Sequence, residues 1–550
     1  MELPGPIGAF VSGPLVTHNA ALFTDLYEVT MAASYFREGM NGPASFSLFV
    51  RRLPKARPFL LAAGLEDALN YLRNFRFSDE AIEYLRTLRL FDVGFLDFLR
   101  SLRFTGRVRA VREGTAIFAD EPLLEITAPI IEAQVVETAV INFCHFQTLL
   151  TSKAARSVIA ARGRPVVEFG LRRTSGIDAG MKAARCAFIA GATMSSNVLA
   201  GLHYGVPPTG TMAHSYVAAF PHEIDSFRAF ARAFPRNTTL LIDTYDTVVA
   251  AHKAVEVAKE MEARGERLGA VRLDSGDIVA LSKAVRRILD DAGLRYVRIF
   301  VSGGLDEHSV ESFLAEGAPI DAFGVGTRMD VSADAPYLDM AYKLVAYDGR
   351  PVLKTSAGKA TLPGEKQVYR VRDAAGRFVG DLLALLDETP PADGQPLLGA
   401  VMESGRLVAP HPPPAAVRDY CAAQIAALPA DLRRLKNPGT YRVRVSDRLA
   451  SLQRSVVAKV VAAEVAPVRR TVTGSERLRE EKLMAQKEKT LQPERSPKAG
   501  RPPGEIVSPP RVRRRQKTAH AEVRKGTTLL ETGHGPRVVQ AAKKPKVKKR

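Results

Sequence analysis

Cysteine is scarce in this 550-residue chain, which has only Cys144, Cys186 and Cys421. They lie far apart and no two have the spacing of a metal clip, so neither a disulfide framework nor a zinc knuckle is expected. Long apolar runs are also missing, since no stretch approaches the roughly 20 residues that span a bilayer. The first residues lack the basic and apolar regions of a secretory signal. We therefore expect a soluble, cytoplasmic protein without membrane insertion.

Acidic residues are scarce in one segment only. Residues 468–550 carry 24 Lys and Arg against 8 Asp and Glu, which is +16 of the formal net charge of +19. This segment is rich in proline and nearly free of aromatic residues, so we expect a disordered basic tail. Its clusters at 511–515 and 543–550 are suited to contact a polyanion. The alternative, favoured on these residues alone, is a solvated run of charge without a partner.

The rest of the chain predicts an α/β protein of two domains. Residues 19–39 have helical spacing, with Asn19 or Thr24 as the cap, and residues 45–54 alternate like a strand. Between 165 and 330, short apolar runs end in Gly, Ser, Thr or an acid and are followed by helical patterns. Such units indicate parallel strands with helical crossovers, and their number favours an irregular β/α barrel with its chemistry at the carboxyl ends of the strands.

The predicted domain boundaries follow from these changes of pattern. Residues 1–150 form an N-terminal α+β domain, which residues 340–460 complete. Residues 151–339 form the catalytic β/α barrel. A C-terminal segment at 340–467 packs on the first domain, and the tail at 468–550 follows.

Two motifs near the middle of the chain carry titratable or charged residues. GTMAHSYV (210–217) is expected to close one strand of the barrel. It places His214 among small and hydroxyl residues, either as a buried, hydrogen-bonded histidine or as a nucleophile or base. EFGLRR (168–173) places Phe169 and Arg172 at a strand end. An aromatic face beside guanidinium groups suits a flat anionic ring, although surface arginines beside a core Phe are a common arrangement.

Acidic residues follow two further predicted strands. In AVRLDSGDI (270–278), Arg272 and Asp274 alternate with apolar residues and therefore point to the same face. They either grip an anion and a hydroxyl or form a structural ion pair. In LIDTYDT (241–247), Asp243 is a candidate to bind a hydroxyl group, or Mg²⁺ through water.

Glycines end two predicted neighbouring strands, Gly303 and Gly304 in VSGGLDE and Gly326 in FGVGT. Glycine lets backbone N–H groups approach an anion, and β/α barrels often bind phosphate after their last two strands. The alternative is two ordinary turns. The chain has no GxxxxGK[ST] loop, which excludes a P-loop enzyme.

Taken together, these motifs resemble those of nicotinate phosphoribosyltransferases. The matching stretches keep the family's order and are TDLYEVTM (24–31), EFGLRRTSGIDAG (168–180), GTMAHSYV (210–217), VRLDSGD (271–277), SGGLDE (302–307) and FGVGT (323–327). The resemblance covers residues 18 to about 455 and leaves the tail unexplained. It implies an ATP-coupled ligase that makes nicotinate mononucleotide from nicotinate and phosphoribosyl pyrophosphate, with Mg²⁺ bound through substrate phosphates rather than by direct protein ligands.

The resemblance also implies roles for individual residues. His214 becomes the phosphohistidine, with Ser215 among the small neighbours that leave room for a phosphoryl group. Tyr27 of the neighbouring subunit in a homodimer and Phe169 stack on the pyridine ring. The remaining implied contacts are Thr211 with nicotinate, Arg272 with its carboxylate, Thr327 and the glycines with phosphate, and Arg172, Asp243 and Asp274 with substrate and magnesium.

The resemblance implies which base the enzyme accepts, nicotinate or nicotinamide, through the residue at position 197. The nicotinamide-using relative has an Asp at the end of the strand in GATMSSN, where alignment places Asn197. A carboxylate acceptor is repelled by Asp and tolerated by Asn, which favours nicotinate. A close enzyme that uses nicotinamide or another base is the competing hypothesis.

Overall fold

The computed structural model describes residues 19–355, 361–465 and 484. The chain divides into two compact units, Met1–Glu481 and Lys482–Arg550, and every element named below belongs to the first. Apart from Met484, the tail at 468–550 lies outside the described residues, so its disorder and its polyanion contact stay predictions, as do the domain boundaries. Within the described ranges, no helix is both long and apolar enough to cross a membrane.

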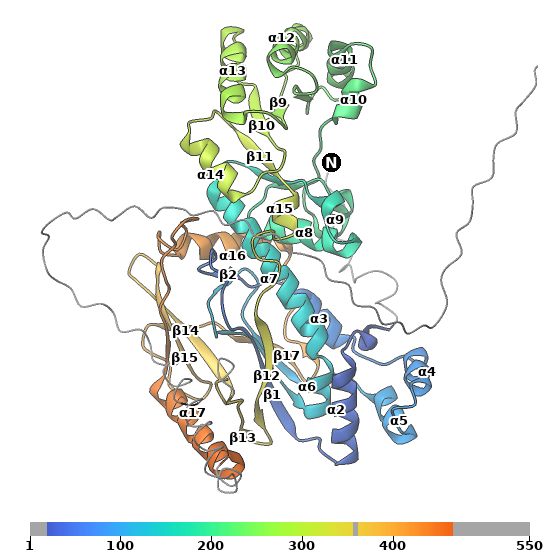
Figure 1. Cartoon of the computed structure of the whole chain (residues 1–550), viewed down its shortest axis with the longest axis vertical. Helices are drawn as coiled ribbons and strands as arrows, with labels where there is room; N and C mark the ends of the chain where they lie inside the picture. The colour runs from blue at the N-terminus through green and yellow to red at the C-terminus, as the bar shows by residue number, and fades with distance from the viewer. Residues whose placement is uncertain (1–18, 356–360, 466–483, 485–550) are drawn as a thin grey trace, which may run out of the picture. The chain divides into compact units, whose positions relative to one another are not determined.

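A seven-stranded antiparallel sheet joins segments that are far apart in the sequence (Figure 1). Its order is β13-β12-β1-β5-β3-β17-β18, with β1 between β5 and β12. The strands are β1 (Pro43–Val50), β3 (Arg107–Ala110), β5 (Pro122–Pro129), β12 (Met340–Tyr347), β13 (Arg350–Pro351), β17 (Gly399–Glu403) and β18 (Arg406–Leu407). The segment after the barrel therefore completes a sheet that the N-terminal segment begins.

Apolar and polar residues alternate along β1, and both faces of the strand are buried. On one face, Phe46 stacks on Tyr342 with ring centroids 4.7 Å apart. On the other, the hydroxyl of Ser47 donates to Glu125 at 2.6 Å, and Glu125 also accepts the backbone N–H of Lys366 at 3.0 Å. The polar positions of this strand thus contribute to a hydrogen-bonded layer inside the protein, which satisfies groups that are costly to bury alone.

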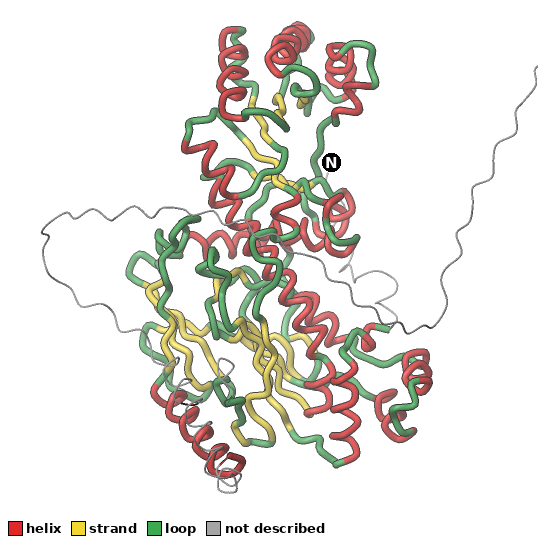
Figure 2. Tube along the Cα trace, viewed as in Figure 1, coloured by secondary structure: helices red, strands yellow, loops and turns green. Residues whose placement is uncertain are grey.

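Smaller sheets and helices surround this sheet, with strands yellow and helices red in Figure 2. One sheet has the order β16-β14-β15-β19, and β2 pairs with β4. The strands are β2 (Leu60–Leu61), β4 (Ala116–Ile117), β14 (Lys366–Arg372), β15 (Phe378–Leu385), β16 (Gly394–Pro396) and β19 (Val443–Val445). The helices are η1 (Ala20–Leu22), α2 (Leu26–Arg37), α3 (Leu65–Arg73), α4 (Asp79–Thr87), α5 (Val93–Ser101), α6 (Ile130–Val135), α16 (Pro414–Ala427), α17 (Asp447–Val460) and η3 (Val461–Val465).

A six-stranded parallel sheet curls into an incomplete barrel of order β7-β6-β11-β10-β9-β8. Its strands are β6 (Val166–Glu168), β7 (Met194–Ser195), β8 (Thr239–Leu241), β9 (Ala270–Leu273), β10 (Arg298–Val301) and β11 (Ala322–Val325). Helical segments in this region are η2 (Leu171–Arg173), α8 (Ile177–Ala190), α9 (Val198–Tyr204), α10 (His214–Ala218), α11 (Glu223–Ala233), α12 (Thr247–Ala263), α13 (Ile278–Asp291), α14 (Glu307–Ala315) and α15 (Thr327–Asp330). The predicted fold class is confirmed.

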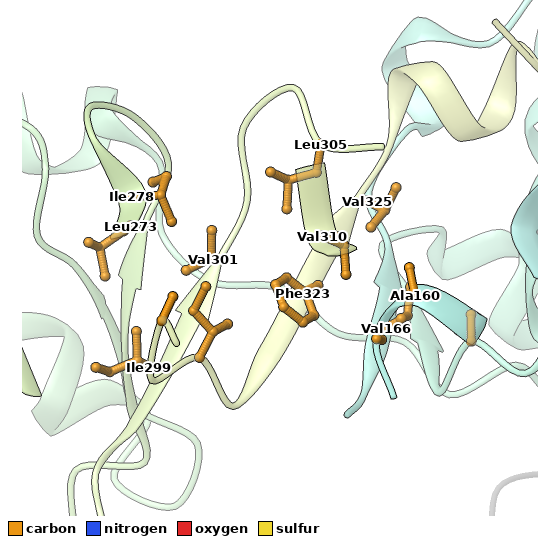
Figure 3. Packing of buried hydrophobic residues seen from close by; sticks show 14 of the residues in the cluster. Ala160, Val166, Leu273, Ile278, Ile299, Val301, Leu305, Val310, Phe323 and Val325 are labelled. Carbon is orange, nitrogen blue, oxygen red and sulfur yellow. The ribbon is translucent and has the colours of Figure 1, made fainter. Parts of the chain in front are cut away.

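The barrel strands are apolar because both of their faces are covered. Figure 3 shows Leu273, Ile299, Val301, Phe323 and Val325 from neighbouring strands, and all five are fully buried. Parallel strands covered by helices lack a solvent face, so their sequences form short continuous apolar runs. The polar residues that follow these runs are consequently placed together at one edge.

Helix α7 (Glu137–Ala160) anchors the barrel through a buried ion network. The ammonium group of Lys153 lies 2.6 Å from a carboxylate oxygen of Glu307, and Nε of Arg156 donates to the same carboxylate at 2.9 Å. Burial acts to raise the pKa of Glu307, but the two cations outweigh it and hold the pKa below its usual range. Because Glu307 begins α14, this network fixes the helix that follows the Gly303–Gly304 turn.

The predicted helix at 19–39 begins later than its caps suggested. Helix α2 starts at Leu26 with Asp25 at the N-cap, and Ala20–Leu22 form a separate short turn. The hydroxyl of Thr24 donates instead to the carboxylate of Glu28 at 2.5 Å. Asn19 is bonded to Ser78 and therefore packs against another helix. A tertiary bond therefore replaces the expected cap at Asn19, whereas Thr24 bonds locally to Glu28 and, at 3.3 Å, to the distant carbonyl of Val135.

Candidate active site

A cavity of about 640 Å³ opens at the carboxyl ends of the barrel strands. Residues that follow β6, β9, β10 and β11 meet there, as expected for parallel strands. Ten of the predicted site residues line it, namely Phe169, Arg172, Thr211, His214, Arg272, Asp274, Gly303, Gly304, Gly326 and Thr327. The wall is completed by Arg173, Ser196, Gly210, Met212, Ala213, Leu241, Ser302 and Gly324.

Arg272 is the most constrained cation of this wall. Its Nε donates to the hydroxyl of Ser302 at 2.8 Å, and Nη1 donates to the hydroxyl of Thr211 at 2.8 Å. Nη2 lies 2.8 Å from Oδ1 of Asp274, two residues along the same strand end. The ion pair, one of the two alternatives that the alternation left open, is therefore present, and it lies in the cavity wall. A guanidinium held on three sides is preorganised to meet an anion.

Asp274 is stabilised as a carboxylate. Burial acts to raise its pKa, but hydrogen bonds from Ser302 and Arg272, together with the positive charge of Arg272, hold the pKa below its ordinary value. The group therefore stays ionised at neutral pH, facing the same cavity as His214. A permanent negative charge at this position suits contact with a hydroxyl group or with a cation bound to substrate.

His214 is the first residue of α10, and the described residues between β7 and this helix form no strand. The prediction that GTMAHSYV closes a barrel strand is therefore wrong, because the segment after Pro208 runs in an irregular conformation to this helix. Nδ1 of the imidazole lies 3.1 Å from the hydroxyl of Thr244, and Nε2 lies 4.0 Å from Oδ2 of Asp274. The side chain is 45% exposed, so the imidazole is not a buried structural histidine.

Asp243 lies directly behind this wall. Its Oδ2 accepts the backbone N–H of Asp274 at 3.0 Å and the hydroxyl of Ser275 at 2.6 Å. Among the described residues, none donates to its buried Oδ1. An oxygen atom left without a donor beside an ionised Asp274 is suited to a hydrated Mg²⁺ or to a ribose hydroxyl.

Phe169 forms an aromatic wall beside Arg272. The guanidinium carbon lies 5.7 Å from the centroid of its ring, and Phe300 packs against the ring edge at 5.6 Å. A β carbon at Gly324 would lie only 2.7 Å from the Phe169 ring, so glycine makes room for it. An aromatic face next to a fixed guanidinium can hold a flat ring that carries a carboxylate.

The two glycine turns depend on glycine for steric reasons. Gly303 has a φ of +91°, and a β carbon there would lie 1.8 Å from the carbonyl oxygen of Asp274. A β carbon at Gly326 would lie 2.8 Å from the carbonyl of Phe169. Each turn therefore packs closely against the end of a neighbouring strand of the sheet, β9 for Gly303 and β6 for Gly326.

Four predicted residues lie outside the cavity wall. Asn197 is buried and caps α9, since its Oδ1 accepts the N–H of Ala200 at 3.0 Å and its Nδ2 donates to the carbonyl of Gly180 at 3.1 Å. Its neighbour Ser196 lines the cavity instead. The others are Ser215, which is exposed on α10, Asp243 behind the wall, and Tyr27 at the start of α2.

Two contributors were missed from the sequence, Thr244 and Ser302. Thr244 contacts the ring of His214, and the hydroxyl of Ser302 also donates to Asp274. Ser302 follows β10 directly, whereas Ile242 and Asp243 separate Thr244 from β8, and each lies next to a glycine or acid that was singled out. Their position at a strand end was the only available signal, because a hydroxyl side chain has no distinctive pattern of its own.

A second cluster has metal-like composition but is an ion network. Glu66, Glu113 and His411 place one ligand atom each within 4.8 Å of one another. The guanidinium of Arg185 already bridges the two carboxylates at 2.6 and 2.8 Å. Burial acts to lower the pKa of His411, but its bond to Glu113 outweighs this and raises the pKa, which favours imidazolium over a metal ligand.

Family models match three successive parts of the chain. They are the N-terminal domain of nicotinate phosphoribosyltransferase at residues 22–145, the nicotinate phosphoribosyltransferase family at 165–372 and the C-terminal domain at 391–453. The three matched segments include every residue that lines the cavity.

Relatives agree over most of the chain. A nicotinate phosphoribosyltransferase of Mycobacterium tuberculosis is 52% identical over 434 residues, which cover 78% of this chain and 93% of the relative. The Bacillus subtilis enzyme is 36% identical over 457 residues, with 78% and 93% covered. The crystal structure of human nicotinic acid phosphoribosyltransferase matches with a TM-score of 0.71 and 31% identity, and covers 79% of this chain and 99% of its own. This chain therefore belongs to the nicotinate phosphoribosyltransferase family.

Proposed function

We propose that this enzyme joins nicotinate to the phosphoribosyl group of phosphoribosyl pyrophosphate and that ATP hydrolysis is coupled to the reaction through phosphorylation of His214. The products are nicotinate mononucleotide, pyrophosphate, ADP and phosphate, and the reaction is the first step of NAD salvage from nicotinate. The observation that carries the proposal is the triply anchored guanidinium of Arg272, beside the Phe169 ring and two glycine turns in one cavity.

Nicotinate binds with its ring on Phe169 and its carboxylate toward Arg272. The 5.7 Å between guanidinium and ring centroid supports this arrangement, because the planar acid offers both a π face and an anion. Thr211, whose hydroxyl accepts from Arg272 at 2.8 Å, is placed beside the same carboxylate. The pyridine nitrogen then points away from the guanidinium, toward the ribose.

Phosphoribosyl pyrophosphate binds across the two glycine turns. Backbone N–H groups at Gly303, Gly304, Gly326 and Thr327 and the guanidinium of Arg172 supply donors for its phosphates. The pyridine nitrogen forms a bond to the anomeric carbon as the bond from that carbon to pyrophosphate breaks. Asp243 and Asp274 would hold a hydrated Mg²⁺ or the ribose hydroxyls, and the bound cation would neutralise the charge of the leaving pyrophosphate.

Phosphorylation of His214 requires one unprotonated ring nitrogen and space. When Nδ1–H donates to the hydroxyl of Thr244, Nε2 has a free lone pair on the side of Asp274. Small neighbours at Gly210, Thr211 and Ala213 leave room for the transferred group. The 45% exposure of the side chain supports access by ATP.

The proposal includes a homodimer with shared sites. Tyr27, 48% exposed at the start of α2, is absent from the cavity wall of its own chain, as is its exposed neighbour Leu26. Apolar residues are exposed beside the cavity as well, including Ile177 and Val198 at the first positions of α8 and α9. A second copy that places Tyr27 over the Phe169 ring covers both surfaces.

Intact mass after incubation with ATP tests the coupling. Wild type is expected to gain one phosphate, and His214→Ala none. His222→Ala, a change of an exposed histidine outside the cavity, is the matched control and keeps the phosphate. We expect His214→Ala to retain ATP-independent transfer because the ribosyl site is intact. Phosphate on His214→Ala, or none on wild type, would contradict the assignment.

Competition between the two bases tests the acceptor. Turnover with nicotinate and little with nicotinamide is expected, since Arg272 pairs with a carboxylate and not with an amide. Efficient turnover of nicotinamide without nicotinate would support the competing hypothesis instead.

A further inference from the structure

Two acidic side chains are buried behind the cavity wall with no role in the proposed chemistry. Glu168 is the last residue of β6 and is fully buried, while Asp330 is the last residue of α15 and is 5% exposed. They flank residues that face the cavity, since Phe169 follows Glu168 and Thr327 begins the helix that Asp330 ends. Two buried negative charges beside a polyanion site are unfavourable unless protons or donors compensate them.

Glu168 has donors on both of its oxygens. Oε2 accepts the hydroxyl of Ser195, on the neighbouring strand β7, at 2.5 Å. Oε1 accepts the backbone N–H of Gly170. Ionised Glu168 is therefore satisfied by hydrogen bonds that link β6 to β7.

One oxygen of Asp330 lacks such a donor within the described part of the chain. No N–H or O–H group among the described residues donates to its buried Oδ2. A β carbon at position 170 would lie 1.8 Å from that oxygen, so Asp330 can approach this closely only because residue 170 is glycine. Both carboxyl groups thus converge on Gly170. A hydrogen bond between two carboxyl groups exists only when one of them carries a proton.

We propose that Glu168 and Asp330 share one proton and, as an acid–carboxylate pair, hold the Gly326–Thr327 turn against the strand end that carries Phe169. Asp330 is then a positioning residue for the phosphates of phosphoribosyl pyrophosphate, which rests on the proposed function. The order β7-β6-β11 supports this role, because the pair connects three adjacent strand ends of the sheet.

The surrounding charges agree with a single shared proton. Burial and the negative charge of Glu168 both raise the pKa of Asp330 well above its ordinary value. Cations on the packed elements are engaged elsewhere or exposed: Lys153 and Arg156 pair with Glu307, Arg328 pairs with Asp306, and Arg172 and Arg173 are exposed. Loss of the proton at alkaline pH therefore leaves two uncompensated anions, whose repulsion displaces the turn.

Affinity for phosphoribosyl pyrophosphate, measured by calorimetry on the full chain between pH 7 and 9.5, tests the pair. Asparagine in Asp330→Asn has nearly the size and shape of aspartate. Its amide N–H donates to ionised Glu168, and it does not titrate between pH 7 and 9.5. Its affinity at pH 7.5 is expected to stay within about twofold of wild type, whereas Asp330→Ala lowers affinity about tenfold through misplacement of the turn. Toward pH 9.5 the affinity of wild type falls, while that of Asp330→Asn stays constant.

Glu121→Gln is the matched control, since Glu121 belongs to a different buried carboxyl pair with Asp381 and lies outside the cavity wall. Its affinity should follow wild type at every pH.

Thermal unfolding measures whether each variant is folded. If Asp330→Ala is unfolded, the test rests on the affinities of wild type and Asp330→Asn toward pH 9.5. Equal alkaline profiles for wild type and Asp330→Asn, or a tenfold loss in Asp330→Asn at pH 7.5, would overturn the pair. Absence of nicotinate turnover in a wild type that binds phosphoribosyl pyrophosphate would instead reject the proposed function.

Discussion

At the scale of the residue, hydrogen bonds to neighbouring side chains hold Arg272 in place in the cavity wall. Arg272 is held by Thr211, Ser302 and Asp274, each from a different strand end or connection. A free arginine would lose rotamer freedom on binding an anion, and these bonds remove that cost before the substrate arrives. The sequence alone placed Arg272 and Asp274 on the same face of one strand, which left an ion pair as one of two alternatives. It did not indicate Ser302, which reaches Arg272 from the next strand.

Glu28 is a second residue whose surroundings determine its state. It is fully buried beside Tyr27, and it accepts the hydroxyl of Thr138 at 2.5 Å and that of Thr24 at 2.5 Å. Burial raises its pKa to about 7 despite these bonds, which act to lower it. The same Thr138 hydroxyl lies 2.8 Å from Asp25, and one hydroxyl proton cannot serve two carboxylates. A proton on Glu28 resolves this conflict.

Stability should therefore depend on pH through Glu28. Because the folded state binds this proton more tightly than the unfolded chain, its contribution is fully present below the ordinary carboxyl pKa and is lost as pH rises to about 7. Glu28→Gln, which cannot titrate, should gain stability relative to wild type between pH 4.5 and 7.5, by roughly 2–3 kcal/mol. Denaturant unfolding at several pH values measures the difference. A constant difference across this range would contradict a titrating Glu28.

At the scale of the element, strand ends and the turns after them form the part of the cavity that is proposed to bind phosphates. The short apolar runs predicted the six parallel strands because burial on both faces demands such sequences. The start of α2 and the irregular segment before His214 could not be predicted in the same way. Thr24 donates to the carbonyl of Val135, and Asn19 accepts from the hydroxyl of Ser78. Both partners are distant in sequence, so these contacts exist only after the chain has folded.

Substitution in the Gly303–Gly304 turn tests whether this turn contributes to the binding of phosphoribosyl pyrophosphate. Gly303→Ala places a β carbon 1.8 Å from the carbonyl of Asp274 at a φ of +91°, so the turn must move. We expect the KM for phosphoribosyl pyrophosphate to rise about tenfold or more, in steady-state assays. Gly317→Ala has a similar φ of +71° but open space around its β carbon, so it should lose about 1 kcal/mol of stability with unchanged KM. Equal KM values for the two variants would contradict a phosphate role for the turn.

At the scale of the whole molecule, the cavity lies in the barrel whereas Tyr27 belongs to the part of the chain that forms the seven-stranded sheet. A single chain does not include Tyr27 in the cavity wall, so the proposed stacking on nicotinate requires a second copy. This arrangement predicts that defects in the two halves of the site complement each other in mixed dimers.

Co-expression of Tyr27→Ala with Arg272→Ala is the corresponding experiment. Each variant alone should be strongly impaired. Half of the randomly formed dimers are mixed and contain one intact site of two, so activity should recover to about a quarter of wild type. Phe169→Ala with Arg272→Ala is the matched control, because both changes lie in the barrel and every mixed site stays defective. Absence of recovery in the first pair would contradict shared sites.

The sequence by itself determined the class of fold and the strand ends that line the cavity, because burial of apolar runs and the need for glycine at tight turns are local requirements. Ten of the predicted site residues accordingly line one cavity. Only the tertiary structure decided the neighbours that set each side chain's state, such as Ser302 on Arg272, Thr244 on His214 and Asp330 against Gly170. These contacts join residues far apart in the chain, and their energies depend on burial that exists only in the folded protein.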